Sequence, residues 1–155
     1  ATNGVVHVVD KVLVPPGVLN VVQMAQANPG AFSSLVGAVV SANLATTLSG
    51  TGPFTVFAPT NTAFAAAPAG LTTEQLTTVL TYHVLDSQVL STAIPFGTPV
   101  ATVAGQDITI NAGTAPVIAT ITDTTATPAT IAAVDVRASN GVIHVIDKVL
   151  LPPAP

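Results

Sequence analysis

Two histidines, His83 and His144, are the side chains of this sequence best suited to chemistry. A neutral imidazole can bind a metal ion or accept a proton near neutral pH. Each has one acidic residue close behind it, Asp86 after His83 and Asp147 after His144, and no further ligand at metal-site spacing. A metal or small-molecule site is therefore one hypothesis. The hypothesis that we favour is a buried imidazole that donates a hydrogen bond to a backbone carbonyl or to Asn61.

Other residue patterns that would indicate catalysis do not occur in the sequence. No Ser lies in a Gly-x-Ser-x-Gly elbow, and no Gly-Lys-Ser/Thr follows the glycines Gly50 and Gly52. The chain has no Cys, and its seven acidic residues are spread along its length, which does not favour a carboxylate pair. We therefore predict a protein that is not an enzyme and that uses no cofactor or metal.

Charge is scarce in this chain. Charged residues make up 6% of the sequence, against about 25% in ordinary soluble proteins. The three basic residues, Lys11, Arg137 and Lys148, are too few to follow a phosphate backbone, and the net charge is −4. This composition excludes nucleic-acid binding. Low charge also does little to keep copies of the chain apart, which favours self-association.

An internal repeat sets the frame for the elements that position these residues. Residues 3–16 read NGVVHVVDKVLVPP and residues 140–153 read NGVIHVIDKVLLPP. Three of the fourteen positions differ, and each difference exchanges one apolar residue for another. His7 is the repeat partner of His144, so we expect the two to share one structural role. A repeat at this separation has the period of a whole domain rather than of a solenoid unit.

The repeat predicts how the chain is divided. Residues 1–16 are predicted to be the closing strand of a preceding domain with its Pro-Pro linker, and residues 17–155 a complete domain. Consecutive prolines end helices and ladders alike, which suits a linker at Pro15-Pro16. The chain would then be a piece of a tandem array.

Each copy of the repeat begins with Asn-Gly, a turn signal, and continues as a strand rich in Val and Ile. In the second copy, Ile143 and Val145 alternate with Val142, His144 and Ile146. Because both faces are mostly apolar, we expect a central strand that is covered on two sides.

The remaining pattern predicts helices first and strands later, which is an α+β arrangement. Apolar spacing predicts helices over 18–27 and 31–44, with Asn28-Pro29-Gly30 ending the first. A short strand is expected over 54–58, followed by a short helix that Thr60 or Asn61 caps. Thr72 and Gln75 have capping-box spacing and predict a helix over 73–80, and several strands are expected between 98 and 151. Predicted core residues are Phe54, Val56, Phe57, Phe64 and residues 142–151.

The chain resembles the fasciclin (FAS1) domain family along nearly its whole length. Residues 54–64, FTVFAPTNTAF, resemble the first signature segment of that family. Tyr82-His83 resembles its central Tyr-His motif, and residues 140–147 resemble its second signature, of which residues 3–10 are another copy. The three motifs occur in the order of the family.

The resemblance implies a fold, a function and candidate contact residues. The fold would be a fasciclin-like β-sandwich or wedge with helices packed around it. The function would be adhesion or matrix interaction outside the cell or at its surface, often from tandem domains. Some members bind integrin-type receptors through an Asp-Ile pair before the second signature and through the Tyr-His region. The matching residues here are Asp135-Val136, which departs from Asp-Ile, and Tyr82-His83.

Taken together, these observations predict a secreted or cell-surface module whose partner is a protein or glycan. No apolar run reaches the ~18 residues of a membrane span, and no signal peptide is expected in this chain. The alternative function is a self-assembling structural subunit of a fibre or surface layer, joined by exchange of the duplicated strand 3–14/140–151. The candidate exchange residues are the apolar ones of the first copy: Val5, Val6, Val8, Val9, Val12 and Leu13.

Overall fold

The α-helices of the described residues all precede Val84, and most strands follow it, so the predicted α+β class is confirmed. The structure, a computed structural model, describes residues 19–115 and 117–153. None of the helices in this part is long and apolar enough to cross a membrane. The helices are α1 (Val21–Gln26), α2 (Pro29–Ser41), α3 (Ala45–Leu48), α4 (Asn61–Ala65), α5 (Thr73–Tyr82) and the 3-10 turn η1 (Ser91–Ala93).

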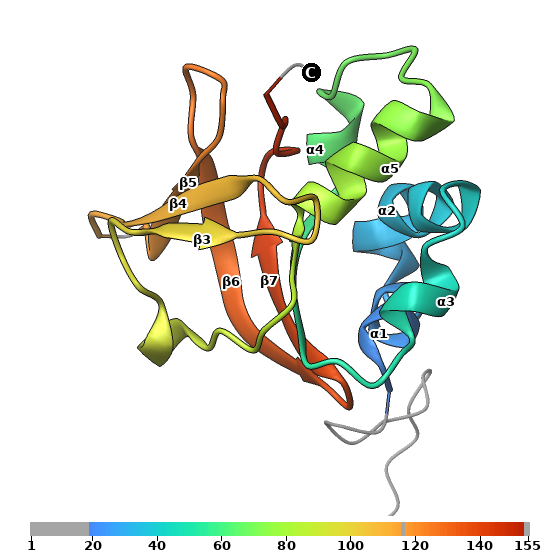
Figure 1. Cartoon of the computed structure of the whole chain (residues 1–155), viewed down its shortest axis with the longest axis horizontal. Coiled ribbons are helices and arrows are strands. Elements are labelled where there is room, and N and C mark those ends of the chain that lie inside the picture. Colours follow the sequence, from blue (N-terminus) through green and yellow to red (C-terminus); the bar gives the residue numbers. More distant parts are fainter. Residues whose placement is uncertain (1–18, 116, 154–155) are drawn as a thin grey trace, which may run out of the picture.

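The strands of the described residues form one mixed sheet in the order β2-β1-β7-β6-β5-β4-β3 (Figure 1). The contact between β1 and β7 is parallel, and the other neighbours are antiparallel. The strands are β1 (Phe54–Pro59), β2 (Val84–Leu85), β3 (Pro99–Ala101), β4 (Asp107–Ala112), β5 (Ala119–Thr122), β6 (Ala129–Ala138) and β7 (Gly141–Ile146).

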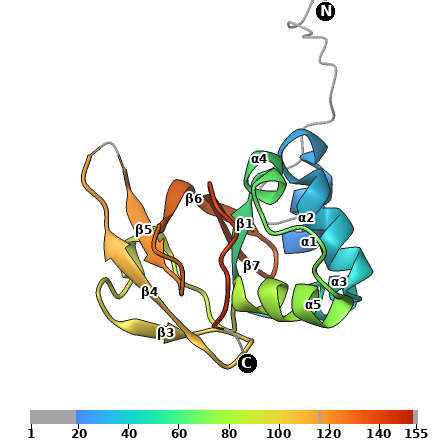
Figure 2. The same cartoon turned by 90° about the horizontal axis from the view of Figure 1, so that it is seen from above.

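The sheet is strongly curled, and its two ends meet. The amide of Val103, in the loop between β3 and β4, donates a hydrogen bond of 2.8 Å to the carbonyl of Val84 in β2. Figure 2 shows the consequence from above: the helices gather on one side, β3 to β6 lie on the other, and β1 and β7 run between them. The predicted wedge of sheet with helices packed around it is therefore confirmed.

The pair β1–β7 forms a wall between two hydrophobic cores. Val56 and Ile143 face the helices, in a core that also holds residues of α1, α2 and α5. Phe57 and Ile146 face the other way, into a core formed with β4, β5 and β6. The alternation predicted for residues 142–146 is thus confirmed, and β7 is a central strand covered on both sides.

The predicted boundaries need three corrections. Asn28-Pro29-Gly30 does not end a long first helix; α1 already ends at Gln26, and Pro29 is the first residue of α2. This is a favourable place for Pro, since the first helical amide has no partner within its helix. The second predicted helix, over 31–44, ends at Ser41, and the short helix α3 that follows it was not predicted. The closing strand ends at Ile146, not at residue 151.

The predicted core is confirmed in its centre and not at its margins. Val56 and Phe57 are buried, whereas Phe54 and Phe64 are half-buried against the helical core. Within 142–151 most residues are buried, but Asp147 is exposed because the chain turns there. The predicted domain boundary at residue 17 and the exchange residues Val5, Val6, Val8, Val9, Val12 and Leu13 lie outside the described residues.

Replacing Phe57 by Ala should lower the free energy of unfolding by about 3–5 kcal/mol, because the ring is 0% exposed and stacks on His144 at 5.6 Å between ring centroids. Urea unfolding monitored by circular dichroism measures the loss. Phe96→Ala is the matched control, since that ring is 45% exposed and should cost little. Equal losses in the two variants would contradict this assignment of the core.

Candidate functional site

His144 lies in the middle of β7 and uses both ring nitrogens for backbone contacts. The amide of Asp135 donates to Nδ1 at 3.3 Å, so Nδ1 carries no proton. The proton is therefore on Nε2, which donates to the carbonyl of Val89 at 2.7 Å. The side chain is 0% exposed, and burial lowers its pKa. His144 is thus a neutral connector between β7, β6 and the segment after β2.

His83, at the end of α5, makes the same kind of contact with the opposite tautomer. The amide of Leu150 donates to Nε2 at 2.8 Å, so Nδ1 carries the proton and donates to the carbonyl of Val79 at 2.7 Å. Burial lowers the pKa of His83 to about 4. Of the two partners predicted, the backbone carbonyl is confirmed. Asn61 instead binds the start of α2, where its Oδ1 accepts from the amide of Ser34 at 2.9 Å.

The two imidazoles have no free lone pair for a metal or a substrate proton. In each ring one nitrogen is protonated and the other accepts from a backbone amide. Among residues 19–115 and 117–153, no group of three or more His, Cys, Asp or Glu side chains is placed to hold a metal ion. Both histidines therefore stabilise the fold by joining backbone segments through hydrogen bonds.

Residues 87–91, here called the crossing segment, pass over β1, β7 and β6 in turn. Thr55 of β1 donates from Oγ1 to the carbonyl of Ser87 at 2.6 Å and accepts from the amide of Val89 at 2.8 Å. His144 of β7 holds the carbonyl of Val89, as described above. One short segment therefore fastens β1 to β7, two strands that are distant in the sequence.

Asp135 of β6 completes the fastening at the far end of the crossing segment. Its carboxylate accepts from the amide of Ser91 at 2.8 Å and also from the Ser91 hydroxyl. The Ser91 hydroxyl is the main reason that the pKa of Asp135 lies below its usual range. Asp135 has a φ of 58°, in an irregular stretch of β6 where the register against β7 shifts. This left-handed conformation directs the amide of Asp135 at His144, and Asp tolerates it better than most residues.

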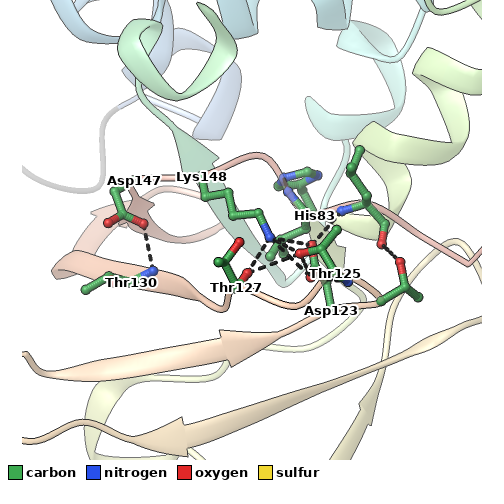
Figure 3. A network of polar contacts seen from close by, with 10 residues as sticks. His83, Asp123, Thr125, Thr127, Thr130, Asp147 and Lys148 are labelled. Atoms are coloured by element: carbon green, nitrogen blue, oxygen red, sulfur yellow. Dashed lines mark hydrogen bonds and ion pairs between the residues drawn. The ribbon is translucent and has the colours of Figure 1, made fainter. Parts of the chain in front are cut away.

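A second cluster fixes the chain after β7, and Figure 3 shows it. Asp123 accepts from the amide of Leu151 at 3.0 Å and pairs with the ammonium of Lys148 at 3.3 Å. Lys148 also reaches Thr125 and the carbonyl of Thr127. Burial alone would raise the pKa of Asp123, but the hydrogen bonds from Thr125, Leu151 and Lys148 outweigh it and lower that pKa. The chain after β7 is thus held by paired polar groups.

Asn140 and Gly141, which begin the last signature, hold the opposite end of β7. The Asn140 side chain accepts from the amide of Val21 at 3.0 Å and donates to the carbonyls of Leu48 and Gly50 at 2.8 and 2.7 Å. A Cβ at Gly141 would lie 2.1 Å from the carbonyl oxygen of Phe54, so only Gly fits there. The start of β7 is therefore joined to α1, α3 and β1.

Comparison with known proteins decides the family. The fasciclin domain profile matches residues 30–152. This chain belongs to the fasciclin domain family. The Synechocystis protein sll1483 is 43% identical to it over an alignment 143 positions long, which covers 87% of this chain and 74% of that protein. The transforming growth factor-beta-induced protein ig-h3 of Sus scrofa is 34% identical over an alignment 157 positions long, which covers 97% of this chain but only 22% of that protein.

A solved structure supports the fold of this fasciclin domain independently. A FAS1 domain pair from the insect cell adhesion molecule fasciclin I superposes with a TM-score of 0.71. The match covers 86% of this chain and 51% of that one at 18% sequence identity. At this identity the likeness shows the shared fold alone.

The residues that the family resemblance assigns to partner contact lie in two different places. Tyr82 and His83 are each 1% exposed, and the Tyr82 hydroxyl donates to the carbonyl of Asp107 at 3.1 Å. Burial is the main reason that the pKa of Tyr82 is raised. Asp135 and Val136 are half-buried in β6, where Val136 pairs with Ile143. Only the second pair reaches the surface of the fasciclin domain.

Sequence reasoning missed Thr55, Ser91 and Asp123, which complete the two polar clusters. Their partners lie 32 or more positions away for Thr55, 44 for Ser91, and 25 and 28 for Asp123 with Lys148 and Leu151. Contacts at such separations leave no local spacing to read. The one available signal was Thr55, a polar residue within the otherwise apolar strand β1, whereas Ser91 and Asp123 lie outside the strands.

The fasciclin domain should lose stability as the pH falls from about 6.5 to about 4. His83 has a lowered pKa of about 4 when folded, so the unfolded chain binds its proton first and gains relative stability throughout this window. For His83 the loss amounts to about 3 kcal/mol, and His144 adds to it in the same direction. Urea unfolding at half-unit pH steps measures it.

The control is His83→Gln, which can still donate and accept but does not titrate. Its stability should vary less over this window than that of the parent. Asp123 and Asp135, whose pKa is lowered, reduce the stability of the folded state only at lower pH, as the pH falls through and below about 4. The substitution at His83 does not affect their contribution. A flat stability profile in the parent between pH 6.5 and 4 would contradict the neutral, buried state of both rings.

Thr55→Val should loosen the crossing segment while the helical core stays intact. The substitution leaves the carbonyl of Ser87 and the amide of Val89 without their partner, at a cost of about 1–3 kcal/mol. Hydrogen exchange should rise at residues 87–91 and stay unchanged in α2. Thr109→Val, on the half-buried face of β4, is the matched control. Unchanged exchange at residues 87–91 would show that Thr55 does not fasten them.

Proposed function

We propose that this fasciclin domain is an extracellular adhesion or matrix-interaction module that works through protein–protein contacts. The observation that carries the proposal is the use made of the signature residues. The polar side-chain atoms of Asn140, His144 and His83 form hydrogen bonds with backbone groups, so these atoms are not available for catalysis or metal binding. The signature residues thus stabilise a scaffold, and the function would come from contacts made by its surface. One structural relative is, by name, a cell adhesion molecule.

The same reasoning supports the remaining parts of the proposal. We infer that the protein is not an enzyme, because catalysis needs a positioned group with a free lone pair or proton, and neither His83 nor His144 has one. We place it in a secreted or cell-surface setting, with a protein or glycan as partner. No nucleic acid is bound, since the sequence contains only three basic residues.

The contact that we propose is the irregular stretch of β6 at Asp135 and Val136. These two residues are half-buried, and a carboxylate beside an apolar residue suits recognition of a protein surface. Tyr82 and His83 belong to the site as internal supports, since each is 1% exposed. His144 joins the two regions through Phe57. Its ring accepts from the amide of Asp135 and stacks on Phe57, and the amide of Phe57 donates to the carbonyl of His83 at 2.8 Å.

Tandem display is the setting in which such a contact would gain strength. Residues 1–16 would be the closing strand and Pro-Pro linker of a preceding fasciclin domain, and residues 17–155 the complete one. The repeat of residues 3–16 at 140–153 supports this division. Linked domains raise the effective concentration of a second contact, so weak sites can act together.

A second candidate function is self-assembly into a fibre or surface layer through the duplicated strand 3–14/140–151. The observation that favours it is the structural position of the second copy. β7 lies in the centre of the sheet, so a copy of its sequence elsewhere in the chain has a defined place to bind. A composition with 6% charged residues offers little repulsion between molecules.

Asp135→Asn should weaken adhesion by about tenfold or more, since it removes the charge of the proposed contact. The amide oxygen of Asn can still accept from the amide of Ser91, and Asn tolerates the left-handed backbone. Attachment of domain-coated beads to surfaces bearing matrix proteins or matrix glycans measures the effect. Asp107→Asn, an exposed carboxylate at the start of β4, is the matched control. Equal attachment by the two variants would rule out Asp135 as the contact.

A further inference from the structure

The contacts of residues 140–153, here called the closing segment, can all be made by its copy at residues 3–16. In the closing segment, specific contacts come from Asn140, Gly141, His144, Asp147, Lys148 and Leu150. The equivalent residues of the copy are Asn3, Gly4, His7, Asp10, Lys11 and Leu13, and each is identical. The place in the fold that the closing segment fills is here called the slot. One chain therefore contains two segments with the polar side chains that contact the slot.

The slot is selective at its start. Asn140 must bridge α1 and α3, and Gly141 must leave room for the carbonyl oxygen of Phe54, 2.1 Å from where a Cβ would lie. Other Val-rich segments without Asn-Gly in this position would not fit.

The slot is also selective at its far end. There Asp147 accepts from the amide of Thr130 at 2.7 Å, and Lys148 pairs with Asp123. The side chain of Asp123 is 0% exposed, so an occupant without a cation at this position would leave that buried carboxylate without its counter-ion. Asp10 and Lys11 meet both demands.

The three differences between the two copies also fit the slot. Val6, Val9 and Val14 of the copy stand where the closing segment has Ile143, Ile146 and Leu151. Each is one methylene smaller, so none would overlap a neighbour. We propose that residues 3–16 of one molecule occupy, in a second molecule, the slot that residues 140–153 otherwise fill. This inference rests on the second candidate function and names its partner, a second copy of this chain.

Insertion into the molecule's own slot is excluded by the length of the connection. The carbonyl of Leu19 accepts from the amide of Ser139 at 2.8 Å, so Leu19 lies beside the start of β7. The six residues of β7 carry the chain about 20 Å away from this point. Figure 1 shows α1 and the end of the closing segment at opposite ends of the molecule. A copy in full register would place Pro16 at that far end, with only Gly17 and Val18 to return to Leu19, a reach of about 10 Å.

The closing segment should win over the copy whenever both are present at one slot. It buries three more methylenes, and a two-residue turn, Ser139–Asn140, already holds it beside β6. We therefore expect exchange to occur only while slots are empty, that is, during folding at high protein concentration. Each insertion releases one closing segment, which can enter a further slot, so the assembly can grow from molecule to molecule.

Engineered cysteines test the register directly, because the chain has none of its own. Ala58 of β1 lies opposite Val145 of β7, and the copy has Val8 in the equivalent position. A chain carrying Ala58→Cys and a second chain carrying Val8→Cys are unfolded together, refolded at high concentration and oxidised. We expect a disulfide-linked heterodimer on a non-reducing gel, several-fold above the level of a Val9→Cys control. That residue corresponds to Ile146, which faces the other core.

Two further arms complete the test. Adding Gly4→Val to the Val8→Cys chain should abolish the cross-link without changing how either chain folds, since its Cβ would meet the carbonyl of Phe54 only in the slot. A single chain carrying both cysteines, refolded at high dilution, should give no internal disulfide. A cross-link no stronger than the Val9→Cys control would overturn the inference, and an internal disulfide would overturn the restriction to separate molecules.

Failure of this inference and failure of the candidate functions can be told apart. Light scattering of the unmodified chain, refolded over a range of concentrations, reports self-assembly by any route. Oligomers without the cross-link would mean assembly through another surface. Adhesion is measured on monomers refolded at high dilution and does not depend on either result.

Discussion

The parallel contact between β1 and β7 is the constraint on which the rest of this structure depends. Each of the two strands presents one face to the helices and one to the curled sheet, so neither core can form without both. The requirement explains why the signature residues concentrate on these strands. Asn140 and Gly141 set the start of β7, His144 fixes its middle, and Lys148 follows its end.

Neutral polar groups do in this fasciclin domain what ion pairs do elsewhere. Two imidazoles in opposite tautomers, a buried Asn and the hydroxyl of Thr55 satisfy backbone groups deep in the fold. Each bridges segments that are far apart in the sequence. A chain with 6% charged residues can therefore hold irregular segments in place, with an ion pair used where Asp123 is buried beside Lys148. The cost of leaving any of these groups unpaired is what makes the arrangement specific.

Local signals predicted much of the fold. The Thr72–Gln75 spacing marked the start of α5, and both bonds of that capping box form. Asn140-Gly141 marked the turn into β7, and apolar alternation identified its two faces. Pro29 misled because Pro suits both the end of one helix and the first turn of the next. Signals of this kind depend only on residues that are close in the sequence.

The candidate site was less accessible to prediction. The signature motifs located His83, His144 and Asp135, but the partners of these residues come from elsewhere: Leu150, Val89 and Ser91. Whether Tyr82 reaches solvent depends on the second core, which strands far along the chain build. Such facts follow from the curl of the sheet and not from any spacing.

The pairing of β1 with β7 also has a consequence for biosynthesis. Phe54 leaves the ribosome long before Gly141, its partner in the sheet. Until the last strand emerges, the helical core lacks Ile143 and Val145, and β1 lacks its parallel neighbour. Because such long-range contacts form late and slowly, the residues from β1 onward must remain unaggregated until β7 has been made. In a tandem array every domain would meet this delay in turn, and each nascent domain would emerge beside a finished one of the same sequence pattern.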